Sequence, residues 1–119
     1  MSNKVAVLMR KAPYGSVYAA EGFRSIMGIG VFEMDISVVF LDDGVYTLVK
    51  GQDATGLDMK ALGDGFPMLP DFGVTQFYVH TPSLSERGLT PDDLVMDVEP
   101  LDDAGVARVL ASCGTVLPF

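Results

Sequence analysis

Asp42 and Asp43 form a pair that could do chemistry, because two adjacent carboxylates can hold a divalent cation or support phosphoryl transfer. They come at the end of the segment DISVVFL, Asp35 to Leu41, which has the apolar, β-branched character of a buried strand. Open α/β sheets bind their ligands beyond the carboxyl ends of the strands. The pair therefore stands where such folds place a site.

The other residues expected at the same edge do not complete a metal or phosphotransfer site. Such a site would normally add a third acid after the first strand and a lysine after a later one. Arg10 and Lys11 follow the first predicted strand instead, and His80 ends the third. The sequence therefore favours a structural role, in which Asp43 caps a short helix that starts near Gly44.

Two chemical alternatives stay open at this edge. Arg10 and Lys11 precede a predicted helix, and a basic pair beside a helix N-terminus can hold an anion. Pro13 and Gly15 in the same loop more simply form a turn. His80, at the end of a strand, could serve as a general base if an acid or nucleophile lay beside it.

The single cysteine, Cys113, and the single histidine exclude several kinds of site. One cysteine allows no internal disulfide, zinc cluster or CxxC redox pair, and one histidine provides no pair for a metal. The glycines fit no nucleotide-binding spacing. Cys113 follows the last predicted helix, where the helix dipole disfavours a thiolate. We therefore predict no metal, no cofactor and a small apolar role for Cys113.

The composition is that of one domain spanning residues 1–119, with 49% hydrophobic and 20% charged residues and a mean hydropathy of +0.33. This apolar content is high for a small soluble monomer, which predicts subunit interfaces. The formal net charge is −8, and from Asp64 onward nine acids face two arginines, so direct nucleic-acid binding is not expected. No segment is long enough for a membrane span or a signal peptide, and we expect a cytoplasmic protein.

Strand-like and helix-like segments alternate along the chain and predict an α/β fold. The expected architecture is a three-layer α/β/α sandwich of flavodoxin-like kind, with a mostly parallel sheet of five strands and the first strand in the centre. The predicted strands are Lys4–Met9, Asp35–Leu41, Val74–His80, Leu94–Val98 and Thr115–Leu117. The predicted helices are Ser16–Gly28, Val45–Val49, Leu57–Leu62, Ser83–Arg87 and Asp102–Ser112.

Three separated motifs together resemble one family. They are RKAPYGSVYAAEG from Arg10, FLDDGVYTLVKGQD from Phe40 and LSERGLTPDDLV from Leu84. In this order and spacing they resemble the DsrF/TusC family, the middle subunits of the DsrEFH and TusBCD sulfur-relay complexes, and the DDGVY and GQD segments are closer to DsrF. The resemblance covers 4–119 and implies a DsrEFH-like fold.

What the resemblance implies is a non-catalytic subunit of a cytoplasmic hetero-oligomer, expected to be a hexamer, that passes persulfide sulfur. The context would be DsrEFH-like sulfur oxidation or dissimilatory sulfur metabolism, with TusBCD-like tRNA 2-thiouridine synthesis as the second context. In the family the carrier cysteine belongs to the DsrE/TusD-like partner, and a DsrH/TusB-like partner can carry another. Cys113 matches no family motif. The motif residues are expected to be partner-facing or structural: Pro13, Tyr14, Gly15, Asp42, Asp43, Gly44, Gln52, Arg87 and Gly88.

Two further functions stay open at this stage. One is a small-molecule or anion-binding α/β protein, or an enzyme, with a strand-end pocket around Arg10, Lys11 and His80. The other is a stand-alone homo-oligomer of the same fold.

Overall fold

The computed structural model describes residues 4–11, 18–30, 35–48, 74, 76–94, 96 and 98–119. Five strands form one sheet, and every neighbouring pair is parallel. The strands are β1 (Lys4–Met9), β2 (Asp35–Phe40), β3 (Gln76–His80), β4 (Glu99–Leu101) and β5 (Thr115–Pro118). The helices are α1 (Tyr18–Gly30), α2 (Thr81–Glu86) and α3 (Asp103–Ala111), with 3-10 turns η1 (Asp42–Leu48) and η5 (Pro91–Asp93).

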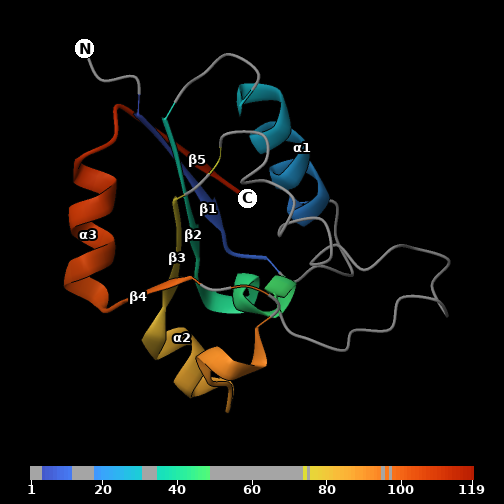
Figure 1. Ribbon diagram of the computed structural model, residues 1–119, viewed down its shortest axis with the longest axis vertical. Helices are drawn as coiled ribbons and strands as arrows, with labels where there is room; N and C mark the ends of the chain where they lie inside the picture. Colours follow the sequence, from blue (N-terminus) through green and yellow to red (C-terminus); the bar gives the residue numbers. More distant parts are fainter. Residues whose placement is uncertain are drawn as a thin grey trace, which may run out of the picture.

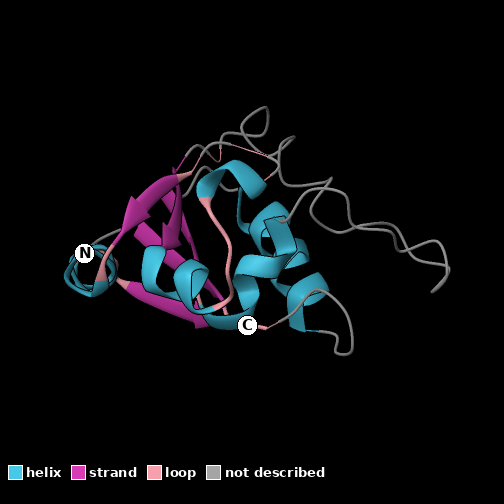
Figure 2. Cartoon of the chain, turned by 90° about the horizontal axis from the view of Figure 1, so that it is seen from below, coloured by secondary structure: helices cyan, strands magenta, loops and turns pink. Residues whose placement is uncertain are grey.

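The predicted three-layer α/β/α architecture is confirmed, and the sheet lies between α3 on one face and α1 on the other (Figures 1 and 2). The strand order is β4-β3-β2-β1-β5. Strands β1 to β4 are therefore added in one direction along the sheet, and the chain then crosses back over the sheet to place β5 beside β1. Because such connections are right-handed, the reversed step puts α3 on the face opposite α1.

The strand order corrects one prediction, since β2 rather than β1 occupies the centre of the sheet. A second correction concerns the fourth strand. The apolar segment Leu94–Val98 was expected to pair, but the strand that pairs with β3 is Glu99–Leu101. This strand lies at the edge of the sheet, where Glu99 and Pro100 stay exposed, so it lacks the apolar signal of a buried strand. The predicted helix Leu57–Leu62 lies outside the described residues.

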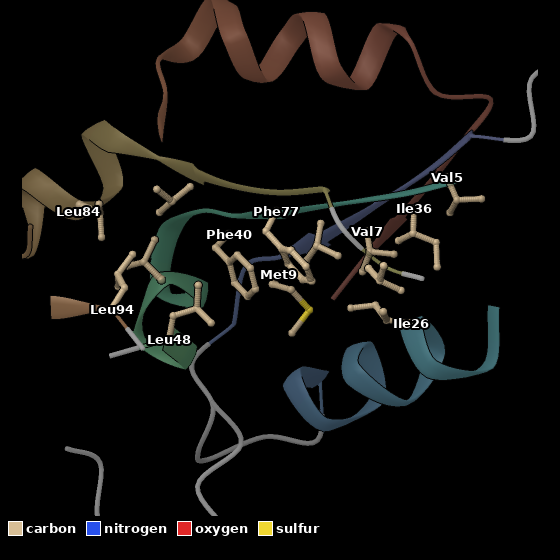
Figure 3. Packing of buried hydrophobic residues seen from close by; sticks show 14 residues of the cluster. Val5, Val7, Met9, Ile26, Ile36, Phe40, Leu48, Phe77, Leu84 and Leu94 are labelled. Atoms are coloured by element: carbon tan, nitrogen blue, oxygen red, sulfur yellow. The ribbon is translucent and has the colours of Figure 1, made fainter. Parts of the chain in front are cut away.

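The main hydrophobic core fills the space between the sheet and α1 (Figure 3). Strands β1, β2 and β3 turn alternate side chains toward it, as the period of two in a strand requires. Burying each such side chain stabilises the fold by about 1.5–3 kcal/mol. The fully buried members with the largest side chains are Phe40, Met9, Ile26, Leu48, Leu84, Val7, Val38, Val45 and Val79.

Helix α3 covers its face of the sheet more loosely than α1 covers the other. Gly105 is its buried residue, while Val106, Val109 and Leu110 are half-buried. Its start is defined by Asp102, whose Oδ1 accepts the backbone N–H of Gly105 at 2.7 Å. The expected helix over Asp102–Ser112 therefore becomes Asp103–Ala111 with Asp102 as its N-cap.

Candidate functional site

After the carboxyl ends of β3 and β4, the chain continues on opposite faces of the sheet. β3 leads into α2, whose Leu84 packs in the same core as Ile26 of α1. β4 leads into α3, which lies on the other face (Figure 3). This divergence makes a topological switch point, the place where open α/β sheets position their ligand sites. His80, the last residue of β3, lies at this switch point.

His80 connects the two diverging connections through both of its ring nitrogens. Nδ1 lies 2.6 Å from Oγ of Ser83 in α2, and Nε2 lies 2.5 Å from Oδ1 of Asp103 at the start of α3. A second link joins the same elements, because the hydroxyl of Thr81 donates to the carbonyl of Leu101 at 3.2 Å. These contacts fasten β4 and α3 to the end of β3.

The hydrogen bonds determine which nitrogen of a neutral His80 carries the proton. An ionised carboxylate can only accept, so Nε2–H donates to Asp103 and Nδ1 must accept. The hydroxyl of Ser83 then donates to Nδ1, and its oxygen accepts the backbone N–H of Asp42 at 2.9 Å. The result is a directed series of bonds from the start of η1 to the start of α3, through Asp42, Ser83, His80 and Asp103.

Serine, histidine and aspartate are also the side chains of nucleophilic hydrolases, but this arrangement differs from theirs in two respects. A catalytic serine gives its proton to Nε2 and must meet substrate, whereas Ser83 bonds Nδ1 and is only 2% exposed. Its oxygen is already used as donor and acceptor. The series is therefore suited to holding elements together, with Asp103 as its solvent-facing end.

A second connection joins η1 to α2 through Asp43 and Arg87. Oδ1 of Asp43 accepts from Nε of Arg87 at 3.1 Å and from Nη2 at 3.0 Å, and Nη1 donates to the carbonyl of Ser83 at 3.1 Å. The guanidinium is mostly buried while the carboxylate is largely exposed. This corrects the prediction that Asp43 caps a helix starting near Gly44, because η1 begins at Asp42 and the carboxylate instead bonds a residue far along the chain.

The backbone at the start of η1 is as constrained as its side chains. Asp42 has a φ of 50°, in the left-handed region that few residues other than glycine adopt, and aspartate tolerates it better than most. A Cβ on Gly44 would lie 1.6 Å from the carbonyl oxygen of Met9, so only glycine fits there. Gly88, which ends the turn after α2, has a φ of 69°. A glycine at position 44 and a glycine at position 88 are thus each required for a steric reason.

The sequence-predicted residues fall into three groups in the structure. Asp42, Asp43, Arg87 and His80 gather at the carboxyl edge of β2 and β3, with Gly44 packed against the end of β1 and Gly88 in the turn after α2. Arg10 and Lys11 lie exposed at the end of β1, which β2 separates from β3 by about 10 Å between backbones. Pro13, Tyr14, Gly15 and Gln52 lie outside the described residues.

Two members of this site, Ser83 and Asp103, were missed by sequence reasoning. The spacing of Ser83, three residues after His80 across a helix start, is the one local signal that could have suggested their contact. Asp103 is brought to His80 only by the return of the chain through β4.

Metal binding is not indicated at this edge, since the described residues contain no group of three or more His, Cys, Asp or Glu side chains placed to hold an ion. None of the described helices is long and apolar enough to cross a membrane.

Cys113 lies at the other end of the strands, between α3 and the start of β5. Its Sγ is 3.9 Å from Oγ of Ser112, and it is partly exposed. Tyr78 of β3 extends on the α3 face of the sheet, and burial, the Glu99 carboxylate and the Cys113 thiol raise the pKa of its phenol. The cysteine thus lies toward the amino ends of the strands, whereas the candidate site lies at their carboxyl ends.

Together, the fold and the site define a class of protein: a small α/β/α sandwich in which the segments that follow β2, β3 and β4 are joined to one another by side-chain hydrogen bonds. Comparisons with known proteins identify the family. The model of the DsrE/DsrF-like family matches residues 3–119. The chain belongs to the DsrE/DsrF-like family.

The relatives found by sequence cover nearly the whole chain. "Intracellular sulfur oxidation protein DsrF" of Allochromatium vinosum is 39% identical, over 98% of this chain and 96% of its own. A "Protein TusC homolog" of Pseudomonas aeruginosa is 36% identical over 92% of both chains, and "Protein TusC" of Escherichia coli is 29% identical over 98% of both. The resemblance to DsrF and TusC seen in the motifs is confirmed, with the higher identity to DsrF.

A solved structure shares the fold. The crystal structure of the ychN protein of Escherichia coli superposes with a TM-score of 0.84 over 100% of both chains at 21% identity. At this identity the likeness concerns the fold alone.

Proposed function

We propose that this chain is a non-catalytic subunit of a cytoplasmic persulfide sulfur-relay complex of DsrEFH-like kind. The observation that carries the proposal is the match to DsrF and TusC relatives along nearly the entire chain. Sulfur oxidation is the first context, because the name of the DsrF relative states it. A TusBCD-like relay toward tRNA thiolation is the second.

The chemistry of a relay explains why the proposed subunit would not carry sulfur itself. A thiolate attacks the outer sulfur of a persulfide, forms a new S–S bond and releases the donor as a thiolate, so each carrier needs an accessible cysteine. The only cysteine of this chain is Cys113, at the end of the sheet opposite the switch point. We therefore propose that sulfur is carried by cysteines of DsrE/TusD-like and DsrH/TusB-like partners.

The carboxyl edge would then present a rigid surface to a partner. Asp42, Asp43 and Glu86 are exposed there, while the groups that hold them, Ser83 and the Arg87 guanidinium, are buried or mostly buried. A surface held by such bonds loses little conformational entropy on association. This supports a structural and partner-facing role for the motif residues in place of a catalytic one.

The proposal is tested by the native mass and composition of the assembly that the N-terminally tagged chain forms in its own cells. We expect a hexamer with two copies each of three small subunits, one of which carries a cysteine near its third strand. An untagged lysate passed over the same resin is the control. A monomer or homo-oligomer, isolated under conditions that keep other complexes intact, would contradict the proposal.

A further inference from the structure

The segment 99–112, which contains β4 and α3, is attached to the rest of the chain differently from the other elements. All of its residues are described, and none of them belongs to the main hydrophobic core. The buried residue of α3 is Gly105, where a Cβ would lie only 3.0 Å from Cδ2 of Leu101 in β4. Helix α3 therefore has its closest packing with the strand that precedes it.

The layer between α3 and the sheet contains smaller and more polar side chains than the core on the other face. The residues of β1 and β2 that alternate with the core residues point to this layer, and the buried ones among them are Ala6, Ser37 and Val39. The Ser37 hydroxyl donates to Oε1 of Gln76 at 2.8 Å, so part of the layer is polar. Less apolar surface is therefore buried under α3 than under α1, and α3 is held less strongly.

The backbone pairing of β4 is also short. This strand ends the strand order and pairs with β3 over three residues. Pro100, in the middle of the three, has no N–H to donate to a neighbouring strand. The strand pairing is thus a weak attachment for the segment.

Two side-chain contacts fasten the start of α3, and both come from the junction of β3 and α2. Nε2 of His80 lies 2.5 Å from Oδ1 of Asp103, and the hydroxyl of Thr81 donates to the carbonyl of Leu101 at 3.2 Å. His80 is fixed in turn by the buried Ser83, whose Oγ lies 2.6 Å from Nδ1. The segment is therefore held at a point that does not move with it.

Both ends of the segment meet residues that are tied to the body of the protein. Val98, just before β4, packs against the main hydrophobic core. Gly114, just after the segment, donates its N–H to the carbonyl of Lys4 at 2.9 Å. A movement of 99–112 can therefore be confined between these two positions.

We propose that residues 99–112 form a flap that opens from the sheet as one unit while the rest of the chain stays folded. The contact between His80 and Asp103 is the latch that keeps this flap closed. Sub-global opening of this kind is expected where a contiguous segment has few buried apolar contacts of its own. The latch lies at the switch point, so the same histidine that joins the elements there also sets how often α3 leaves the sheet.

Opening of the flap changes what the chain exposes. It removes β4 from β3, so the outer backbone groups of β3 lose their partners, and it uncovers Ser37 and Val39 of β2. A free strand edge is a site for unwanted pairing, and the closed latch protects against it. This inference goes beyond the proposed function, because it concerns a motion of the chain by itself. Failure of either leaves the other standing.

Hydrogen exchange of the purified full chain, followed by mass spectrometry of its peptides, tests whether the flap exists. After correction for intrinsic rates, the protected amides of 99–112 should exchange at one common rate, at least about tenfold faster than the slowest amides of β1 and β2. Exchange of 99–112 at the same rate as β1 and β2 would overturn the inference, because it would show that α3 opens only when the whole chain unfolds.

A double-mutant cycle tests the latch. Asp103→Ala is compared in the unchanged chain and in His80→Phe, which keeps a ring but has no nitrogen, so effects of alanine on the helix itself cancel. The rate increase that Asp103→Ala causes in 99–112 should be about fivefold larger in the unchanged chain, where there is a hydrogen bond to lose. Equal increases in the two backgrounds would overturn the latch, and so would an increase that extends equally to β1 and β2.

Discussion

Replacing Ser83 by alanine tests whether the bonds at the switch point stabilise the fold. The change removes the acceptor for the Asp42 N–H and the donor for Nδ1 of His80. Ser83 is 2% exposed, so no water can take its place without rearrangement. Two neutral hydrogen bonds contribute about 1 kcal/mol each, and water that reaches the exposed Asp42 segment recovers part of the loss. The expected net destabilisation is about 1.5 kcal/mol.

The matched control is Ser85→Ala in the same short helix, where the serine is exposed. Both variants gain the same few tenths of a kcal/mol in helix propensity, so their difference isolates the buried hydroxyl. Urea unfolding followed by circular dichroism should show a midpoint for Ser83→Ala that is about 0.7 M below that of Ser85→Ala, at a slope of about 2 kcal/mol/M. Midpoints within about 0.2 M of each other, equivalent to roughly 0.4 kcal/mol, would refute the role assigned to these bonds.

Two other predictions concern the same end of the sheet and the α3 face. Gly44→Ala should lower the free energy of unfolding by more than about 2 kcal/mol, because the new Cβ would overlap the Met9 carbonyl. In the control Gly28→Ala the new Cβ has nothing within 4 Å, so this change should be neutral or stabilising by up to about 1 kcal/mol. Equal urea midpoints for the two variants would contradict the close approach of Gly44 to Met9. Burial and the Glu99 carboxylate raise the pKa of Tyr78, so the folded state favours the neutral phenol. The resulting contribution to stability is present below about pH 10, the pKa of an unfolded tyrosine, and is lost as pH rises through the higher pKa of the folded state. Unfolding free energies measured at pH 9 and pH 11 should therefore fall less for Tyr78→Phe than for the unchanged chain, and identical falls would show that Tyr78 contributes nothing.

Local patterns were sufficient to predict the strands that lie inside the sheet. The run KVAVLM predicted β1 with its observed bounds, because a strand covered on both faces must be apolar at nearly every position. The same reasoning did not predict β4, because an edge strand of three residues can carry Glu99 and Pro100 and then has no apolar pattern. Sequence patterns thus follow apolar content: β5, also at an edge, was predicted from its apolar residues Val116 and Leu117, whereas the charged and proline-bearing β4 was missed.

The site shows the same limit in a different form. The position of Asp42, Asp43 and His80 at strand ends follows from the order of elements along the chain. Their partners do not, because Asp43 meets Arg87 across 44 positions and His80 meets Asp103 across 23. A cap was therefore predicted for Asp43 from its neighbours, while the structure supplies a guanidinium from a distant turn. Such pairings are set by topology, which a single sequence reveals only after the strands have been ordered.

The most direct test of the central claim is to locate the persulfide sulfur within the assembled complex. The native complex would be loaded with ³⁵S persulfide by a cysteine desulfurase, digested without reductant and mapped by mass spectrometry, with a Cys113→Ser complex loaded in parallel. The account predicts that label appears on a cysteine of a partner subunit, that Cys113 stays unlabelled and that the variant complex loads to the same extent. Label on Cys113, or loss of loading in an intact variant complex, would contradict it.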